Sequence, residues 1–213
     1  CSGNSVIGCA ISSNGYCGVY MDGTQSGGRC EANTIDRCVI TGNKASGLIL
    51  NGGAEGRCLG NTIADCTVSD NKQDGIKLNG YQGCCDGNLI VRCSISANAF
   101  AGVRLSGSEG QVRGNRLENN LFVENVDSGI RLEAVDANRI QNNHITGSLG
   151  ENSYGIISYQ SSANLIVQNM CFDYQSNFSM SANDVYGPIV TASGALSTTN
   201  GAAGLSPWAN FSR

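Results

Sequence analysis

The most restrictive feature of the sequence is an internal repeat, marked by an asparagine that returns every 23 to 29 residues. Apolar or small residues follow two and seven positions after it, and a glycine then opens a short apolar segment. Short strands with asparagine and glycine at their corners, repeated with this period, predict a β-solenoid. The repeat asparagines are Asn4, Asn33, Asn61, Asn88, Asn115, Asn138 and Asn164.

Other repeat folds fit this pattern less well. A leucine-rich repeat requires a denser leucine pattern, and collagen requires glycine at every third position. A sandwich of antiparallel hairpins would not keep asparagine at the same corner through successive turns. Stacked asparagines can hydrogen-bond to one another and to the turn backbone, which favours parallel coils.

The coil N-T-I-x-x-C-x-I…N…G-I-x-L-x-G, of which residues 61–80 are an example, resembles the right-handed parallel β-helix repeat of the pectin-lyase-like superfamily. The resemblance extends from Asn4 to about Val190. It implies an all-β, right-handed parallel β-helix of about seven coils over residues 1–190. Because the superfamily includes lyases, hydrolases, tailspikes and adhesins, the resemblance does not select an activity.

The C-terminal segment has a different composition from the repeats. Residues 191–213 are rich in glycine, alanine, serine and threonine, and we expect them to form a tail or cap. The last residues also resemble the tails of bacterial surface β-helix proteins. We expect the segment either to fold over its own last coil or to reach a neighbour through Trp208 and Phe211.

Eight of the eleven cysteines fall in two columns, three residues before and five residues after the repeat asparagine. In the fifth and sixth coils both columns lose their cysteines together, which favours pairing within each coil. Disulfides indicate an oxidising compartment, so we expect a secreted bacterial protein, outside the cell or at its surface. The predicted pairs are Cys1–Cys9, Cys30–Cys38, Cys58–Cys66 and Cys85–Cys93.

Two other interpretations of these cysteines remain open. Free buried thiols pack well as small hydrophobic groups. A structural zinc site fits less well, because it needs four ligands and each coil offers two. Cys171 occupies an apolar column and is predicted to pack in the core. Cys17 and Cys84 are predicted near corners. There we expect them either to form disulfides with another chain or to remain buried free thiols.

One predicted strand face carries the arrangement that most suggests ligand binding. A lysine and two arginines are expected to stack in neighbouring coils, about 4.8 Å apart. They could form a groove for an acidic polysaccharide, with two tyrosines as platforms for sugar rings. Flanking acidic residues favour the other interpretation, a solvated face that only keeps the sheet soluble. The residues of this candidate site are Lys77, Arg104, Arg131, Tyr20, Asp22, Glu133 and Tyr159.

The sequence predicts no catalytic residues. Asp65, Asp70 and Asp74 belong to one coil, with Asp65 expected on an outward strand position and Asp70 at the next corner, so they should lie apart rather than form a hydrolase pair. The single histidine, His144, has no acid or nucleophile predicted beside it. We expect no metal and no cofactor. If the protein is an enzyme, the fold implies a polysaccharide lyase or glycoside hydrolase.

Charge and hydropathy argue against two kinds of partner. The formal net charge is −4 at pH 7, which argues against a general nucleic-acid binder. No segment has the eighteen or so apolar residues of a membrane span.

The start of the sequence suggests self-association. Cys1 already lies in the repeat register, so we expect an uncapped first coil that another copy or another part of a longer protein covers. The expected function is a non-catalytic structural or surface-assembly module that stacks head to tail. The alternative is a protein that binds or degrades acidic polysaccharide.

Overall fold

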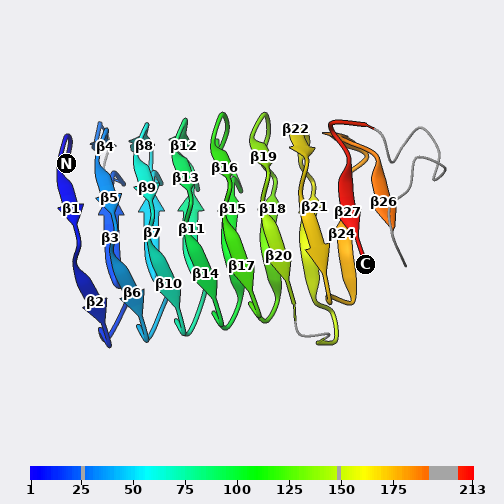
Figure 1. Ribbon diagram of the computed structural model, residues 1–213. Coiled ribbons are helices and arrows are strands. Elements are labelled where there is room, and N and C mark those ends of the chain that lie inside the picture. Colours follow the sequence, from blue (N-terminus) through cyan, green and yellow to red (C-terminus); the bar gives the residue numbers. More distant parts are fainter. Residues whose placement is uncertain (25–26, 148–149, 192–205) are drawn as a thin grey trace.

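The protein is an all-β solenoid. The computed structural model describes residues 1–24, 27–147, 150–191 and 206–213. Its strands form parallel sheets, three of which run the length of a rod and gain a strand from each successive coil (Figure 1). The predicted fold class, a right-handed parallel β-helix, is confirmed.

The described strands form four sheets. The first contains β1 (Ser5–Ile7), β5 (Thr34–Asp36), β9 (Thr62–Ala64), β13 (Leu89–Val91), β16 (Arg116–Glu118), β19 (Arg139–Gln141), β22 (Ser162–Val167) and β25 (Asn183–Tyr186). The second contains β2 (Ala10–Ser12), β6 (Val39–Thr41), β10 (Thr67–Ser69), β14 (Ser94–Ser96), β17 (Leu121–Val123), β20 (His144–Thr146), β23 (Met170–Phe172), β27 (Asn210–Ser212) and β26 (Ile189–Thr191). The third contains β3 (Val19–Asp22), β7 (Leu48–Asn51), β11 (Ile76–Asn79), β15 (Ala101–Ser106), β18 (Ser128–Glu133), β21 (Tyr154–Tyr159) and β24 (Ser176–Ser179). The fourth contains β4 (Arg29–Glu31), β8 (Arg57–Leu59) and β12 (Cys84–Asp86).

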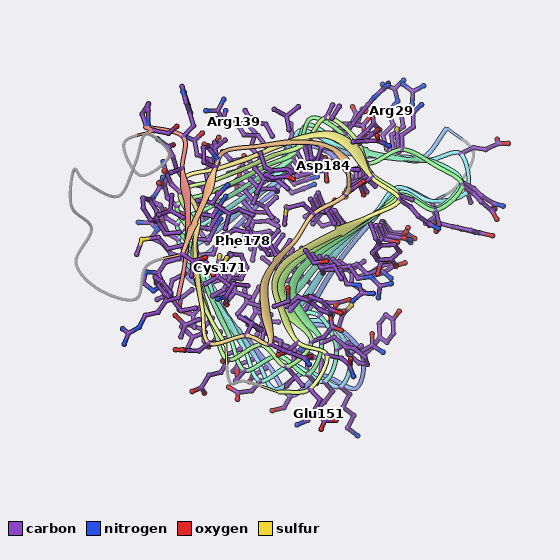
Figure 2. All side chains as sticks on the ribbon, turned by 90° about the vertical axis from the view of Figure 1, so that its right-hand side faces the viewer. Arg29, Arg139, Glu151, Cys171, Phe178 and Asp184 are labelled. Carbon is purple, nitrogen blue, oxygen red and sulfur yellow. The ribbon has the colours of Figure 1, made fainter. Side chains whose placement is uncertain are left out.

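One continuous core fills the rod, because the same position of every coil points inward. Ile35 pairs with Ile63, and Ile63 with Ile90, in exact β-register, and all three are buried. Figure 2 looks along the rod and shows Cys171 and Phe178 in the interior, whereas Arg29, Arg139 and Glu151 lie on the outside. A buried apolar column of this kind stabilises each coil only through its neighbours.

Tight bends separate the short strands. Arg37, Asp65 and Arg92 occupy the same bend, four residues after the repeat asparagine, with φ of 51°, 53° and 54°. The prediction that Asp65 lies on a strand was therefore wrong, since the left-handed backbone there ends β9 and begins the turn into β10. Asp70, with φ of 57°, lies at a corner as expected.

Buried asparagines form ladders along the rod. Asn61 Nδ2 donates to Asn88 Oδ1 and to the carbonyl of Cys30, both at 2.9 Å. Its Oδ1 accepts from the backbone N and the Nδ2 of Asn33 at 3.0 and 2.9 Å. Two further ladders run through Asn14, Asn43, Asn71, Asn98 and Asn125, and through Asn120, Asn143, Asn169 and Asn210. These bonds satisfy side chains that would otherwise be costly to bury.

A column of glycines brings the third sheet close to the second ladder. A Cβ on Gly75 would lie 2.6 Å from the carbonyl oxygen of Gly102 and 2.8 Å from Asn98 Nδ2. The backbone can approach the ladder this closely only without a side chain. This explains the glycine that opens each apolar segment of the repeat.

Part of the predicted tail belongs to the solenoid. Residues 192–205 lie outside the described residues. Asn210–Ser212 forms β27, which pairs in parallel with β23 and β26, so the end of the segment folds over its own last coil. No helix among the described residues is long and apolar enough to cross a bilayer.

Candidate functional site

The predicted basic residues share one column of the third sheet. Lys77 pairs with Arg104, and Arg104 pairs with Arg131, in neighbouring strands β11, β15 and β18. The column continues to Ile49 and Tyr20 on one side and to Ile157 on the other. The predicted register is confirmed, so these side chains do stack along one outer face of the rod.

Carboxylates neutralise the two arginines of this column. Arg104 donates through Nε and Nη2 to Glu133 Oε2 at 3.0 and 2.6 Å. Arg131 donates to the other oxygen of Glu133 and, through Nη1, to Asp127 Oδ2 at 3.1 Å. Its guanidinium also lies over the ring of Tyr159, 5.3 Å from the centroid. Both arginines are held in ion pairs rather than free to bind an external anion.

Burial and ion pairing have opposite effects on these groups. Glu133 is only 6 % exposed. Burial raises its pKa and is the largest effect, but the hydrogen bonds from Arg131 and Arg104 outweigh burial and leave the pKa lowered. Burial lowers the pKa of Arg131, but its interactions with Glu133 and Tyr159 outweigh this and leave the pKa raised. The carboxylate and the guanidinium therefore hold their charges more firmly than free side chains.

A small cavity of about 190 Å³ lies beside this cluster. Asp74, which is buried, lines it and accepts a hydrogen bond from the backbone N of Ala101 at 3.2 Å. Burial raises the pKa of Asp74, and the nearby Arg104 only partly offsets this. The other residues lining the cavity are Phe100, Arg104, Asp127 and Arg131.

The remaining predicted site residues do not join this cluster. Tyr20 and Asp22 lie on β3, three coils from Arg104. Both interact with Asn51, whose Nδ2 lies 2.6 Å from the Tyr20 hydroxyl and 3.5 Å from Asp22 Oδ1. Tyr20 therefore lies on β3 and Tyr159 on β21, in widely separated coils and different columns, so the two tyrosines do not form one platform.

Sequence reasoning missed Asp74 and Asp127 as members of the cluster. They precede Lys77 and Arg131 by three and four residues. An acid just before a strand that carries an outward cation was the available signal. This signal alone could not place the acid beside the cation, because the bend before the strand brings the two side chains together and the sequence does not reveal that bend.

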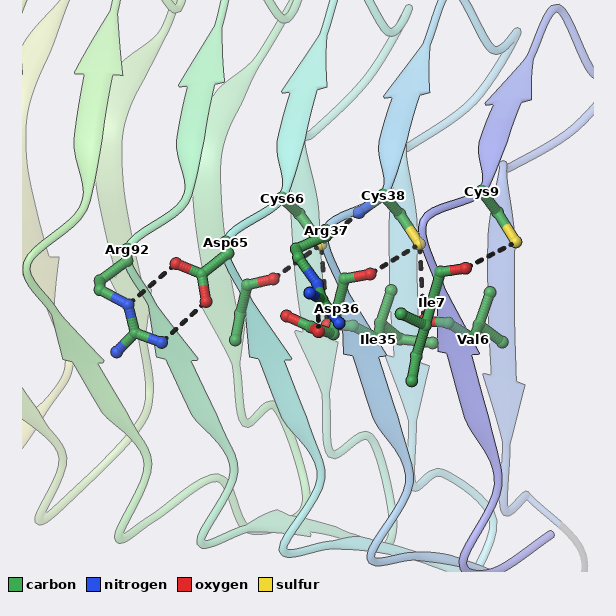
Figure 3. Close-up of polar contacts among 11 residues, drawn as sticks. Val6, Ile7, Cys9, Ile35, Asp36, Arg37, Cys38, Asp65, Cys66 and Arg92 are labelled. Atoms are coloured by element: carbon green, nitrogen blue, oxygen red, sulfur yellow. Dashed lines mark hydrogen bonds and ion pairs between the residues drawn. The ribbon is translucent and has the colours of Figure 1, made fainter.

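Other charged side chains form local pairs. Arg92 makes a two-bond ion pair with Asp65 at 2.9 and 2.7 Å, whereas Arg37 pairs with its neighbour Asp36 at 2.8 Å (Figure 3). His144 stacks between Leu121 and Met170. Among the described residues, no group of three or more histidine, cysteine or acidic side chains could hold a metal ion.

All eleven cysteines are free thiols in this structure. The predicted within-coil pairs are not formed in it, and disulfide formation stays a prediction. Cys171 is fully buried in its apolar column, as expected. Cys17 is buried beside Ala45 and Ile49, and Cys84 is partly exposed.

The coiled parallel sheets and the buried asparagine ladders define a right-handed parallel β-helix protein. The family model described as "Right handed beta helix region" matches residues 1–172, and the chain belongs to this family. Comparison with curated proteins finds no match. A similar solved structure is pectate lyase Pel9A, with a TM-score of 0.63 and 20% sequence identity. The match covers 85% of this chain but 47% of that enzyme, and at this identity it shows the fold alone.

Proposed function

We propose that this protein is a non-catalytic structural β-solenoid, secreted by a bacterium, that works outside the cell as a surface-assembly module and associates end to end. The charge balance of the candidate face supports the proposal most directly. Three cations, Lys77, Arg104 and Arg131, share that face with three carboxylates, Asp74, Asp127 and Glu133. A face whose two arginines are already paired with its own carboxylates is better suited to rigidity than to binding a polyanion.

The first coil described has strand edges that a second copy or further coils can cover. Strands β1, β2 and β3 are the outermost strands described at one end of their sheets. The inward side chains of Val6, Ile11 and Val19 pack on the core but are only half-buried. Unpaired strand edges and part-exposed apolar groups favour pairing with another strand-bearing surface, whether a second copy or further coils.

A matched pair of variants in β1 tests end-to-end association. Val6 points into the rod and packs on the core, so Val6→Lys places a charge in the apolar surface that an added coil would cover. Ile7 points to solvent, so Ile7→Lys places the same charge outside that surface. By sedimentation velocity and electron microscopy, we expect wild type and Ile7→Lys to form particles longer than one rod, and Val6→Lys to stay monomeric. Wild-type protein that remains a monomer at every concentration would contradict the proposal.

The alternative function is binding or cleavage of an acidic polysaccharide at the same face. The fold shared with pectate lyase Pel9A and the cavity beside Arg104 favour it, and the charge balance counts against it. Its test is polygalacturonate binding by wild type and by the Lys77→Ala/Arg104→Ala/Arg131→Ala variant, with ultraviolet detection of unsaturated products. Binding or cleavage that the triple variant loses would establish the alternative.

A further inference from the structure

The two cysteine columns run along the rod with one cysteine per coil. Cys30, Cys58 and Cys85 pair in β-register on β4, β8 and β12. Cys1 extends this first column, because the bridge between Ser2 and Glu31 places Cys1 beside Cys30. The second column lies at the bends that follow the first-sheet strands, and Figure 3 shows three of its members in line along the rod. Its members are Cys9, Cys38, Cys66 and Cys93.

Column cysteines have sulfur neighbours in the adjacent coil. Cys1 Sγ is 2.6 Å from Cys30 Sγ. The hydrogen bond with the Cys85 thiol, followed by burial, raises the pKa of Cys58. In the second column the hydrogen bond with the Cys93 thiol lowers the pKa of Cys66. One thiol of that pair is thus favoured as the thiolate, the form that attacks a disulfide.

Cysteines of the same coil are held apart by a whole strand. Cys30 lies on β4 and Cys38 follows β5, a strand whose three residues span about 10 Å at about 3.3 Å per residue. A disulfide requires Cα atoms within about 7 Å. The two sulfurs also have different neighbours: Cys30 Sγ lies 3.4 Å from Asn33 Nδ2, and Cys38 Sγ lies 3.4 Å from the carbonyl of Asp36.

The residues that replace cysteine in later coils show that side chains of the second column form bonds between adjacent coils. Asn120 and Asn143 continue the column, and Asn120 Nδ2 donates to Asn143 Oδ1 at 3.0 Å. The junction is direct, since the backbone N of Cys93 donates to Asn120 Oδ1 at 2.9 Å. Side chains at this position bond between coils, so the joint loss of both cysteines does not require a bond within a coil.

We propose that the eight column cysteines are oxidised to four disulfides between adjacent coils: Cys1–Cys30, Cys58–Cys85, Cys9–Cys38 and Cys66–Cys93. Neighbouring parallel strands lie about 4.8 Å apart, within the range of Cα separations that a disulfide spans. The oxidant is a small or protein disulfide. One cysteine thiolate attacks it and releases one of its thiols, and the partner thiolate then attacks the mixed disulfide and releases the second. Two S–H groups are lost, one S–S bond forms, and the oxidant is reduced to two thiols.

Burial divides the four disulfides into two classes. Cys1 and Cys9 are exposed, whereas Cys58, Cys85, Cys66 and Cys93 are at most 2 % exposed. The outer pairs are therefore accessible to reagents in the folded protein. The inner pairs form before the coils close over them.

Tryptic mapping distinguishes the two pairing schemes. The protein is refolded with oxidised and reduced glutathione, alkylated under denaturing conditions, digested without reduction and analysed by mass spectrometry. A Cys17→Ser/Cys84→Ser background is used, because Cys17 shares a tryptic peptide with Cys1 and Cys9, and Cys84 shares one with Cys85. Pairing between coils links peptide 1–29 to 30–37 and 38–44, and links 58–72 to 78–92 and 93–104. Pairing within coils instead closes 1–29 and 58–72 on themselves and links 30–37 to 38–44 and 78–92 to 93–104.

Cys58→Val provides a second, independent test. The chain itself has valine in this column at Val112, which is buried, so the variant should fold. We expect it to free Cys85 and to keep the Cys66–Cys93 bond. A free Cys66 would establish pairing within coils, and folded wild type in which all eleven cysteines remain free thiols after oxidative refolding would overturn the proposal of disulfides altogether.

Discussion

At the scale of the residue, the fold depends on asparagine side chains that use their full hydrogen-bonding capacity. Asn98 is completely buried and donates to the carbonyl of Val68 at 3.1 Å and to Asn125 Oδ1 at 3.0 Å. Its Oδ1 accepts from the backbone N and Nδ2 of Asn71. Each side chain in the ladder therefore connects three coils at once.

Replacing a central ladder residue should be costly. Asn98→Ala leaves a buried backbone carbonyl and two buried donors without partners, and we expect a loss of about 2–4 kcal/mol in the free energy of unfolding. The control is Asn14→Ala, at the exposed end of the same ladder, which should lose less than about 1 kcal/mol. Urea denaturation followed by circular dichroism compares them. Equal losses for the two variants would show that the ladder does not act through buried partners.

The repeat predicted the ladders and the core, because both depend on residue type at a fixed position. It did not predict the backbone of the bends. Arg37, Asp65 and Arg92 adopt a left-handed conformation although none of them is glycine or asparagine; the signal lies in other coils, where the same position is Gly8, Asn119 or Asn142. The rule that strand side chains alternate was applied one residue past the end of β9, which wrongly placed Asp65 on the strand.

At the scale of the element, the outer face of the third sheet is organised by charge. The stacking of Lys77, Arg104 and Arg131 followed from strand register and could be predicted. The pairing of Arg104 and Arg131 with Asp127 and Glu133 could not, because it depends on bend geometry and on rotamers that no repeat position encodes. The sequence therefore predicted the column of cations and the nearby Glu133 but missed Asp74 and Asp127, and ligand binding at this face stays a prediction.

This face should make stability depend on pH in the acid range. The folded-state pKa of Glu133 is lowered from its ordinary value of 4.5, so its stabilisation is fully present above that value and is lost as pH falls through the lowered pKa. We expect Glu133→Gln to lose about 2 kcal/mol at pH 7, because Arg104 loses its carboxylate partner and Arg131 loses one of its two, and to differ less from wild type at lower pH.

Thermal unfolding of both proteins between pH 7 and pH 2.5 measures this effect. Glu55→Gln removes an exposed carboxylate and serves as the control, with a pH profile like that of wild type. A constant difference between wild type and Glu133→Gln across this range would contradict the argument.

At the scale of the whole molecule, each coil is stabilised by the coils on both sides of it. Strands β1, β2 and β3 pair with only one neighbour each among the described strands, whereas β9, β10 and β11 pair with two. In dilute monomer we expect amides of the first coil to exchange hydrogen roughly tenfold or more faster than those of the third. Hydrogen-exchange mass spectrometry measures this, and equal rates in a verified monomer would indicate a single cooperative unit.

The asparagine ladders give the rod a direction. In every ladder the amide oxygen accepts from the preceding coil and the amide nitrogen donates to the following one, so the side-chain dipoles add along the axis as peptide dipoles do in a helix. The first ladder ends on Asp184, a carboxylate that accepts from Asn164 Nδ2 at 2.8 Å. A negative charge thus meets the positive pole of the column, and the two ends of the rod are electrostatically unlike.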